Sequence, residues 1–206
     1  MDMPYHDTFY YGRFYHIFNR SINNEVAFRT KRNYMFFLER WGKYIGDLLE
    51  VYAYCLLPTH FHFFARVSES FTKLEKFRKA LSDFSDVNAL LENQFMLLFR
   101  SYALAFNKEN NRSGGLFQKS FKRIRIDTEK YFTTVIHYIH NNPIHHHYQD
   151  SYEKWPFSSY NAYLSNSPTK VRREDVLDWF GSKSAFVEFH AENIKYDKVN
   201  QYLIDV

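Results

Sequence analysis

The chain has 206 residues, of which 45% are hydrophobic and 24% are charged, with a formal net charge of +4 at neutral pH. This composition excludes a disordered chain, and the lack of any run of about 18 uncharged apolar residues excludes a membrane-spanning helix. Cys55 is the only cysteine, which excludes an internal disulfide framework and a four-cysteine zinc site. Residues 1–13 lack the apolar core of a signal peptide, so we expect a cytoplasmic protein.

Aromatic residues and the distribution of charge point to a class of partner. The chain contains 22 Phe and 17 Tyr. Between residues 100 and 130 eight Lys and Arg stand against three Asp and Glu (8 − 3 = +5), whereas residues 171–206 carry five against seven (5 − 7 = −2). Cations bind phosphates and aromatic rings stack on bases, so this pattern favours single-stranded nucleic acid. A solvated surface with a core rich in Phe is the alternative interpretation.

The first half of the chain predicts a strand, a helix and then a pair of strands. Residues 13–19 form an aromatic run that is typical of a strand. Residues 30–45 repeat apolar side chains at spacings of three and four, which predicts an amphipathic helix. Residues 49–57 and 60–67 flank Pro58 and Thr59, and these two apolar runs predict a tight β-hairpin.

In the second half, helical periodicity returns from about Phe71 and is firmer over residues 87–106. Residues 116–126 alternate apolar and basic side chains, which predicts a strand with a cationic face. The residues from Asp127 onward favour the start of a helix that should run to about Asn141, before Pro143.

This order of elements, β-α-β-β-α-β followed by a further helix, predicts an α+β fold. We expect a ferredoxin-like or RRM-like antiparallel sheet with helices on one face. Residues 10–150 should form this domain, and residues 151–206 should form a C-terminal helical extension packed on it. Within the extension, residues 155–160 and 174–180 are expected to be helical.

The triplet His60-Phe61-His62 lies in the second predicted strand of the hairpin. Side chains alternate between the faces of a strand, so the two imidazoles should project together while Phe61 enters the core. Two neighbouring imidazoles are half of a metal site. The chain contains ten His, however, and such a triplet also arises by chance.

A second pair of polar residues, Tyr138 and Asn142, lies near the end of the helix expected before Pro143. Residues four apart share one helix face, so the phenol and the amide should be presented together. They could supply a nucleophile and an oxygen ligand. The plainer interpretation is that Tyr138 packs in the core and that the polar residue before the proline ends the helix.

Taken together, these motifs resemble the HUH single-tyrosine transposases, in particular the REP-associated tyrosine transposases. The resemblance spans about residues 10–165, with the motifs in the family's order. It is carried by residues 15–20 (YHIFNR), 57–62 (LPTHFH), 115–118 (GLFQ) with 121–122 (FK), 138–143 (YIHNNP) and 155–160 (WPFSSY).

The resemblance implies a metal-dependent enzyme that nicks and rejoins single-stranded DNA near hairpins. His60 and His62 would be metal ligands, with Asn142 as the third and Mg²⁺ or Mn²⁺ as the ion. Tyr138 would attack a phosphodiester and form a 5′-phosphotyrosine. A non-catalytic single-stranded nucleic-acid-binding protein is the alternative from another class.

We also expect a set of basic residues to contact the DNA, with those near the last strand lining one side of a groove. A homodimer is possible under this resemblance, and a membrane partner is not expected. The chain departs from relatives at Thr59, which replaces an Asn, and at the run that follows the proline, Ile144 and residues 145–147 (HHH), whose role the sequence leaves open. The expected DNA-binding residues are Arg20, Lys119, Lys122, Arg123 and Arg125.

Overall fold

A computed structural model describes residues 5–70, 86–197 and 200–203. Its centre is a four-stranded sheet in the order β2-β3-β1-β4, and every neighbouring pair is antiparallel. The predicted α+β class with an antiparallel sheet is therefore confirmed. The strands are β1 (Phe14–Arg20), β2 (Leu49–Leu56), β3 (His60–Val67) and β4 (Lys122–Ile126).

The first helix and the hairpin form where local sequence signals favour them. Helix α1 (Lys31–Tyr44) begins at Thr30, whose hydroxyl accepts a hydrogen bond from the Asn33 amide in a reciprocal capping box. Strands β2 and β3 are joined by a tight turn in which the Leu57 amide donates to the His60 carbonyl at 2.8 Å. The helix predicted over residues 30–45 and the predicted hairpin are both confirmed.

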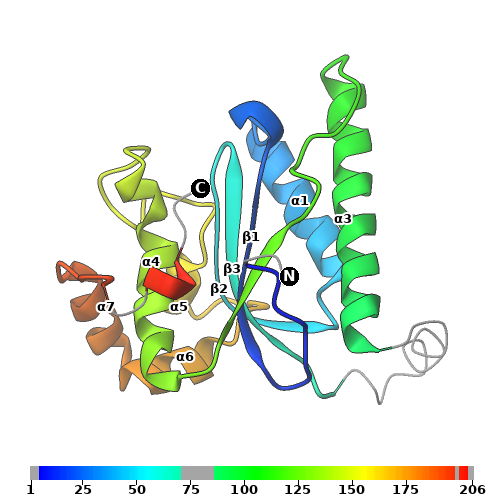
Figure 1. Cartoon of the computed structure of the whole chain (residues 1–206). Coiled ribbons are helices and arrows are strands. Elements are labelled where there is room, and N and C mark those ends of the chain that lie inside the picture. The colour runs from blue at the N-terminus through cyan, green and yellow to red at the C-terminus, as the bar shows by residue number, and fades with distance from the viewer. Residues whose placement is uncertain (1–4, 71–85, 198–199, 204–206) are drawn as a thin grey trace.

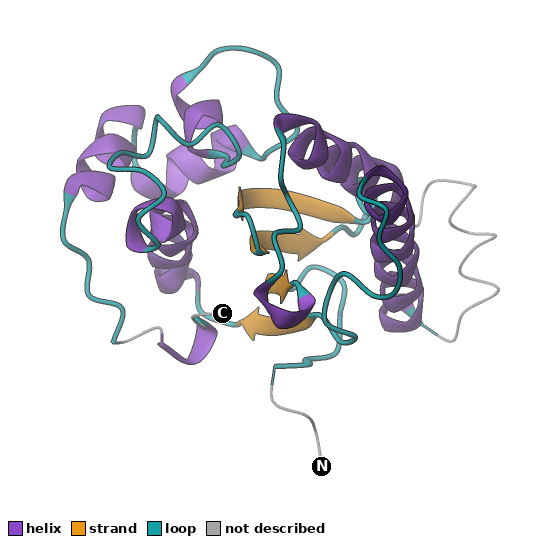
Figure 2. Cartoon of the chain, turned by 90° about the horizontal axis from the view of Figure 1, so that it is seen from above, coloured by secondary structure: helices purple, strands orange, loops and turns teal. Residues whose placement is uncertain are grey.

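Helices cover both faces of the sheet rather than one. Helices α1 and α3 (Val87–Glu109) pack together on one face, and α4 (Phe132–His145) lies against the other (Figures 1 and 2). The two helices within the β-α-β-β-α-β order thus lie on one face, as expected, and α4, the further helix after it, covers the other. The reason is that β3 carries large rings on both faces: Phe61 packs on Phe37 of α1, and Phe64 packs on Phe132 of α4.

Strand β4 is shorter than predicted. Residues 122–126 pair with β1, but the preceding part of the predicted strand does not join the sheet in register. Phe117 instead forms an isolated bridge with Ser21, beyond the end of β1. The alternation of apolar and basic residues over 116–126 thus marks a strand only in its second half.

Helix α4 also differs from its predicted bounds. A short 3-10 helix (Glu129–Tyr131) precedes it, and it continues past Pro143 to His145. A proline inside a helix removes the hydrogen bond of its own missing N–H and crowds the carbonyl one turn before it, but it leaves the amides that follow it free to donate. The last turn persists because the His146 amide donates to the Asn142 carbonyl at 2.9 Å.

After α4 the chain forms short helices that surround it, seen at the left of Figure 1. The predicted helix over 174–180 corresponds to α6, whereas residues 155–159 run along the edge of β2 instead of forming a helix. There the Leu56 amide donates to the Phe157 carbonyl at 2.9 Å. The short helices are α5 (Tyr160–Leu164), α6 (Arg173–Phe180), α7 (Lys183–Ala191) and a 3-10 helix, η4 (Asn200–Tyr202).

Two further expectations are left open by the described residues. The helical periodicity predicted from Phe71 falls on residues 71–85, which lie outside them. The division into residues 10–150 and an extension from 151 stays a prediction, although Trp155 donates its indole N–H to the Leu56 carbonyl at 2.9 Å. No helix in the described ranges is long and apolar enough to cross a membrane.

Candidate active site

His60 and His62, both on β3, lie side by side on the face of the sheet that α4 covers. His60 and His62 have ring centroids 5.3 Å apart, and their side chains are 2% and 0% exposed. Phe61 between them is buried on the opposite face, against α1. The predicted geometry of this triplet is confirmed.

Helix α4 brings the second predicted pair to the same place. Tyr138 packs edge-to-face on His62, with ring centroids 5.8 Å apart, and the side chain of Asn142 lies near enough to His60 to raise the pKa of that ring. Alternate residues of a strand are about 6.8 Å apart, and helical residues four apart are about 6 Å apart along the axis. Because α4 runs antiparallel to β3, Tyr138 and Asn142 match the spacing of the two histidines.

Each of the two histidines has one ring nitrogen paired and the other unpaired. The His60 Nδ1 atom lies 2.9 Å from the Thr59 hydroxyl, and the His62 Nδ1 atom lies 2.9 Å from the Nε2 atom of His16. Within the described part of the chain, the Nε2 atoms of His60 and His62 are buried with no hydrogen-bond partner. Buried polar atoms are nearly always paired, so two such atoms on one face fit a site for a ligand.

Both rings are held in the neutral form. Burial lowers the pKa of His60 to about 3, and the nearby His146 and Arg20 lower it further. Burial also lowers the pKa of His62 well below its usual value, with the neighbouring His16 adding to the effect. A neutral imidazole with an unpaired nitrogen is the form that binds a metal ion.

Asn142 is placed to complete such a site. It is 2% exposed, and its Nδ2 atom donates to the Tyr138 carbonyl at 2.8 Å, which leaves its amide oxygen as the acceptor. No three His, Cys, Asp or Glu side chains among the described residues are grouped to hold a metal ion. A metal here would therefore need the amide oxygen as its third protein ligand, and two imidazoles with one oxygen suit Mn²⁺, or Mg²⁺ with additional oxygens.

The Tyr138 ring is enclosed by aromatic neighbours. It is 6% exposed and meets His16 and Tyr196 edge-to-face, with ring centroids 5.9 and 5.5 Å away. A cavity of about 140 Å³ adjoins this ring, lined by Tyr138, Asn142, Tyr196 and Leu203 among others.

Of the histidines whose role the sequence left open, His146 comes to the site. Its ring centroid lies 5.0 Å from that of His60. His145 lines the cavity beside Tyr138, and His147 is exposed with a positive φ of 59° after the end of α4. His16 was missed as a site residue, although its place on β1 opposite β3 puts it on the histidine face.

The basic residues expected to line one side of a groove are divided between two faces. Lys122 is opposite Phe18 in the sheet and faces the histidines, whereas Arg123 is opposite Ile17 and faces α3. Consecutive strand residues alternate, which is why one face cannot carry both. Arg20, at the end of β1, is opposite His60.

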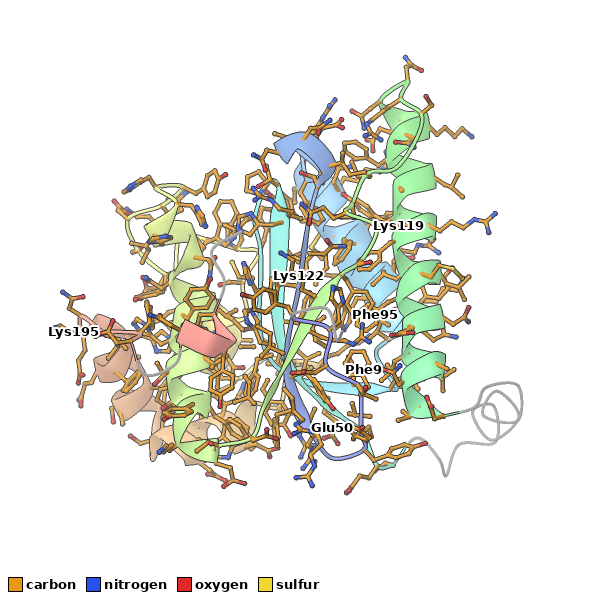
Figure 3. The ribbon with its side chains drawn as sticks, viewed as in Figure 1. Phe9, Glu50, Phe95, Lys119, Lys122 and Lys195 are labelled. Carbon is orange, nitrogen blue, oxygen red and sulfur yellow. The ribbon has the colours of Figure 1, made fainter. Side chains whose placement is uncertain are left out.

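The other expected cations have different surroundings. Lys119 is exposed and lines a separate groove of about 810 Å³ between α3 and residues 115–123 (Figure 3 shows it beside α3, apart from Lys122 on the sheet). Arg125 forms an ion pair with Asp127 at 2.7 Å. The DNA-binding role of these residues stays a prediction. The expectation that they line one side of a single groove is wrong, because they lie on different faces of the sheet.

We expect Arg123 to contribute to stability. It is 6% exposed, pairs with Glu92 at 2.5 Å and donates to the Asp7 carbonyl at 2.7 Å. Arg123→Ala should lower the free energy of unfolding by about 2 kcal/mol, because buried charged hydrogen bonds are lost. Urea unfolding measures this, with Lys119→Ala as the exposed control. Equal stability of the two variants would contradict it.

Comparisons with known proteins agree with the motifs. No family model matches the chain. A Haemophilus influenzae protein described as a REP-associated tyrosine transposase is 27% identical over 113 residues, which are 54% of this chain and 58% of that protein, so the match spans less than two thirds of the relative.

A solved structure, that of a REP-associated tyrosine transposase bound to a REP hairpin, has a similar fold. The TM-score is 0.57 with 18% sequence identity, and the match covers 82% of this chain and 89% of that one. At this identity the likeness concerns the fold alone. The resemblance to this kind of transposase is thus found by sequence and by fold.

Proposed function

We propose that this protein is a metal-dependent tyrosine transposase that nicks and rejoins single-stranded DNA at hairpin-flanked sites. The observation that carries the proposal is the meeting of four residues: two histidines with unpaired Nε2 atoms on β3, and a tyrosine and an asparagine from α4 at the matching spacing. A protein that only binds nucleic acid has no need of this arrangement. The similarity to REP-associated transposases supports the same conclusion.

In the proposed reaction the scissile phosphate exchanges its bond to the 3′-oxygen for a bond to the phenol oxygen of Tyr138. Its phenol oxygen attacks the scissile phosphorus and loses its proton, an O–P bond forms, and the bond from phosphorus to the 3′-oxygen breaks, so that a 3′-hydroxyl departs. A divalent cation held by His60, His62 and Asn142 would neutralise the phosphate and stabilise the departing oxygen. The phosphotyrosine preserves one phosphodiester bond, so a 3′-hydroxyl can reverse the step and rejoin DNA.

Two cations on the histidine face would guide the strand. Arg20 lies opposite His60, and its Nε atom is buried without a hydrogen-bond partner in the described residues, although its guanidinium bonds Asn24. Lys122 lies over the ring of Phe18, further along the same face. Tyr138 is only 6% exposed and Tyr196 packs edge-to-face on it, so Tyr196 would have to move away from α4 for the substrate to reach the phenol.

The test is a covalent complex with DNA. Single-stranded hairpin DNA labelled at its 3′ end should become attached to the protein in Mn²⁺ or Mg²⁺, and the attachment should survive denaturation. The same DNA labelled at its 5′ end should instead release a shorter labelled strand, since the protein keeps the 5′-phosphate. Binding without either product, for any hairpin and either metal, would favour the non-catalytic alternative.

Two single substitutions, each of which removes one positive charge, test which face binds the DNA. Lys122→Gln should weaken hairpin binding several-fold at low salt and reduce the salt slope by about one unit or less, because one phosphate contact is lost. Lys119→Gln removes the same charge from the groove beside α3 and should have less effect. Fluorescence anisotropy at several salt concentrations measures both. The reverse order of effects would place the DNA along α3.

A further inference from the structure

A relay of hydrogen bonds connects the site to His16 on β1 and to Tyr202 in η4. The Nδ1 atom of His16 lies 2.6 Å from the backbone carbonyl oxygen of Tyr202, and its Nε2 atom lies 2.9 Å from the Nδ1 atom of His62. His16 and His62 are both 0% exposed. Both imidazole rings of this relay are therefore shielded from water.

The relay fixes the position of each proton. A carbonyl oxygen only accepts, so the His16 Nδ1 atom must carry a hydrogen. The two hydrogen-bond partners of His16, a carbonyl and an imidazole, are uncharged, and a buried charge between such partners is costly, so the ring is neutral and its Nε2 atom is an acceptor. The His62 Nδ1 atom must then donate to it. A neutral His62 with its proton on Nδ1 has its lone pair on Nε2, the atom without a partner.

A second relay of the same kind shows what such a chain looks like when it serves structure alone. The His190 Nδ1 atom donates to the Phe186 carbonyl, and its Nε2 atom accepts from His140 at 2.9 Å. The remaining His140 nitrogen then accepts from the Ser159 hydroxyl at 2.8 Å. That relay ends on a hydroxyl, whereas the relay through His16 ends on an unpaired nitrogen of His62, the ring that packs on Tyr138.

We infer that His16 is a positioning residue, which holds His62 in the tautomer that presents the Nε2 lone pair to a divalent cation. This inference rests on the proposed metal site. The partner of a ligating histidine fixes its tautomer and ring orientation, and losing that partner typically weakens metal binding about 10–100-fold. Because His16 donates to the Tyr202 carbonyl, its orientation also depends on the position of η4.

Two variants separate this role from packing. His16→Phe keeps a planar ring but removes the acceptor for His62. His16→Gln can return an acceptor oxygen near the place of Nε2. Thermal unfolding checks that both variants are folded before any other comparison.

The first measurement is the tautomer of His62, read from ring-nitrogen NMR of the metal-free protein. The proton should be on Nδ1 in the wild type, should move at least partly to Nε2 in His16→Phe, and should return to Nδ1 in His16→Gln. The second measurement is Mn²⁺ binding. It should weaken about 10–100-fold in His16→Phe and largely recover in His16→Gln.

The outcomes distinguish this inference from the proposed function. A His62 proton on Nε2 in the wild type, or a folded His16→Phe with unchanged tautomer and Mn²⁺ affinity, would overturn the role of His16. If the tautomers follow the expected pattern but the wild type binds no Mn²⁺ and forms no DNA adduct, the control of His62 by His16 is supported and the metal-dependent function fails instead.

Discussion

Replacing Tyr138 by Phe is expected to abolish the covalent DNA complex and strand cleavage together, while hairpin binding is retained. The substitution removes the oxygen that would be joined to phosphorus and keeps the ring, which packs edge-to-face on His16, His62 and Tyr196. The adduct of 3′-labelled DNA should fall below detection on a denaturing gel. Hairpin affinity should stay within about twofold by our estimate, since cations and stacking carry binding.

Tyr196 provides the matched control, because it is the other tyrosine of the same cavity. Its hydroxyl lies 2.8 Å from the His137 Nδ1 atom and points into that contact. Tyr196→Phe should therefore keep adduct formation and change stability by about 1 kcal/mol, the value of one hydrogen bond. An adduct that persists in Tyr138→Phe and is lost in Tyr196→Phe would make Tyr196 the nucleophile.

The positions of the candidate ligands could be predicted because they depend on local periodicity. Strand alternation determines that His60 and His62 share a face, and helical spacing determines that Tyr138 and Asn142 share another. Local periodicity does not determine that the strand face and the helix face meet, because this depends on tertiary packing. The motif order implied it by resemblance, and the structure provides it through α4 packing on β3.

The errors of the sequence analysis arose where tertiary contacts outweigh local pattern. The alternation over residues 116–126 indicated one cationic face, but β4 begins only at Lys122, and the buried Arg123 serves an ion pair with Glu92. Pro143 was expected to lie beyond the helix, yet packing and the bond from the His146 amide extend α4 past it. His16 was missed because its role requires the register between β1 and β3 and a carbonyl from residue 202.

Acid is expected to destabilise the fold through the histidines between α4 and α7. His137 contacts the hydroxyls of Tyr196 and Tyr152 at 2.8 and 3.2 Å, and His190 lies in the second relay. Burial lowers the pKa of His137 to about 4 and that of His190 to about 3, from the ordinary value of 6.5. In this range the unfolded chain binds protons that the folded protein excludes.

The direction of the pH dependence follows from this difference in proton binding between the unfolded and the folded states. Above pH 6.5 both states are neutral and the full stability is present, and stability then falls as the pH drops from about 6.5 toward about 4. Two such groups should together cost about 3 kcal/mol between pH 6.5 and pH 5, because each approaches a slope of about 1.4 kcal/mol per pH unit only below pH 6.5, where the unfolded ring is already half protonated. The other buried histidines act in the same direction. Because a domain is stable by only about 5–15 kcal/mol, we expect unfolding well above the pKa values of the carboxylates.

Urea unfolding at a series of pH values, with His137→Phe and His147→Gln beside the wild type, tests this prediction. His137→Phe removes one titrating group, so its unfolding free energy should depend less steeply on pH by up to one proton. His147 is exposed, and its replacement should leave the slope unchanged. A wild-type stability that is constant from pH 7 to pH 5 would mean that these rings accept protons in the folded state. The relay through His140 would then have to rearrange, because a protonated His190 cannot accept the hydrogen bond that His140 donates.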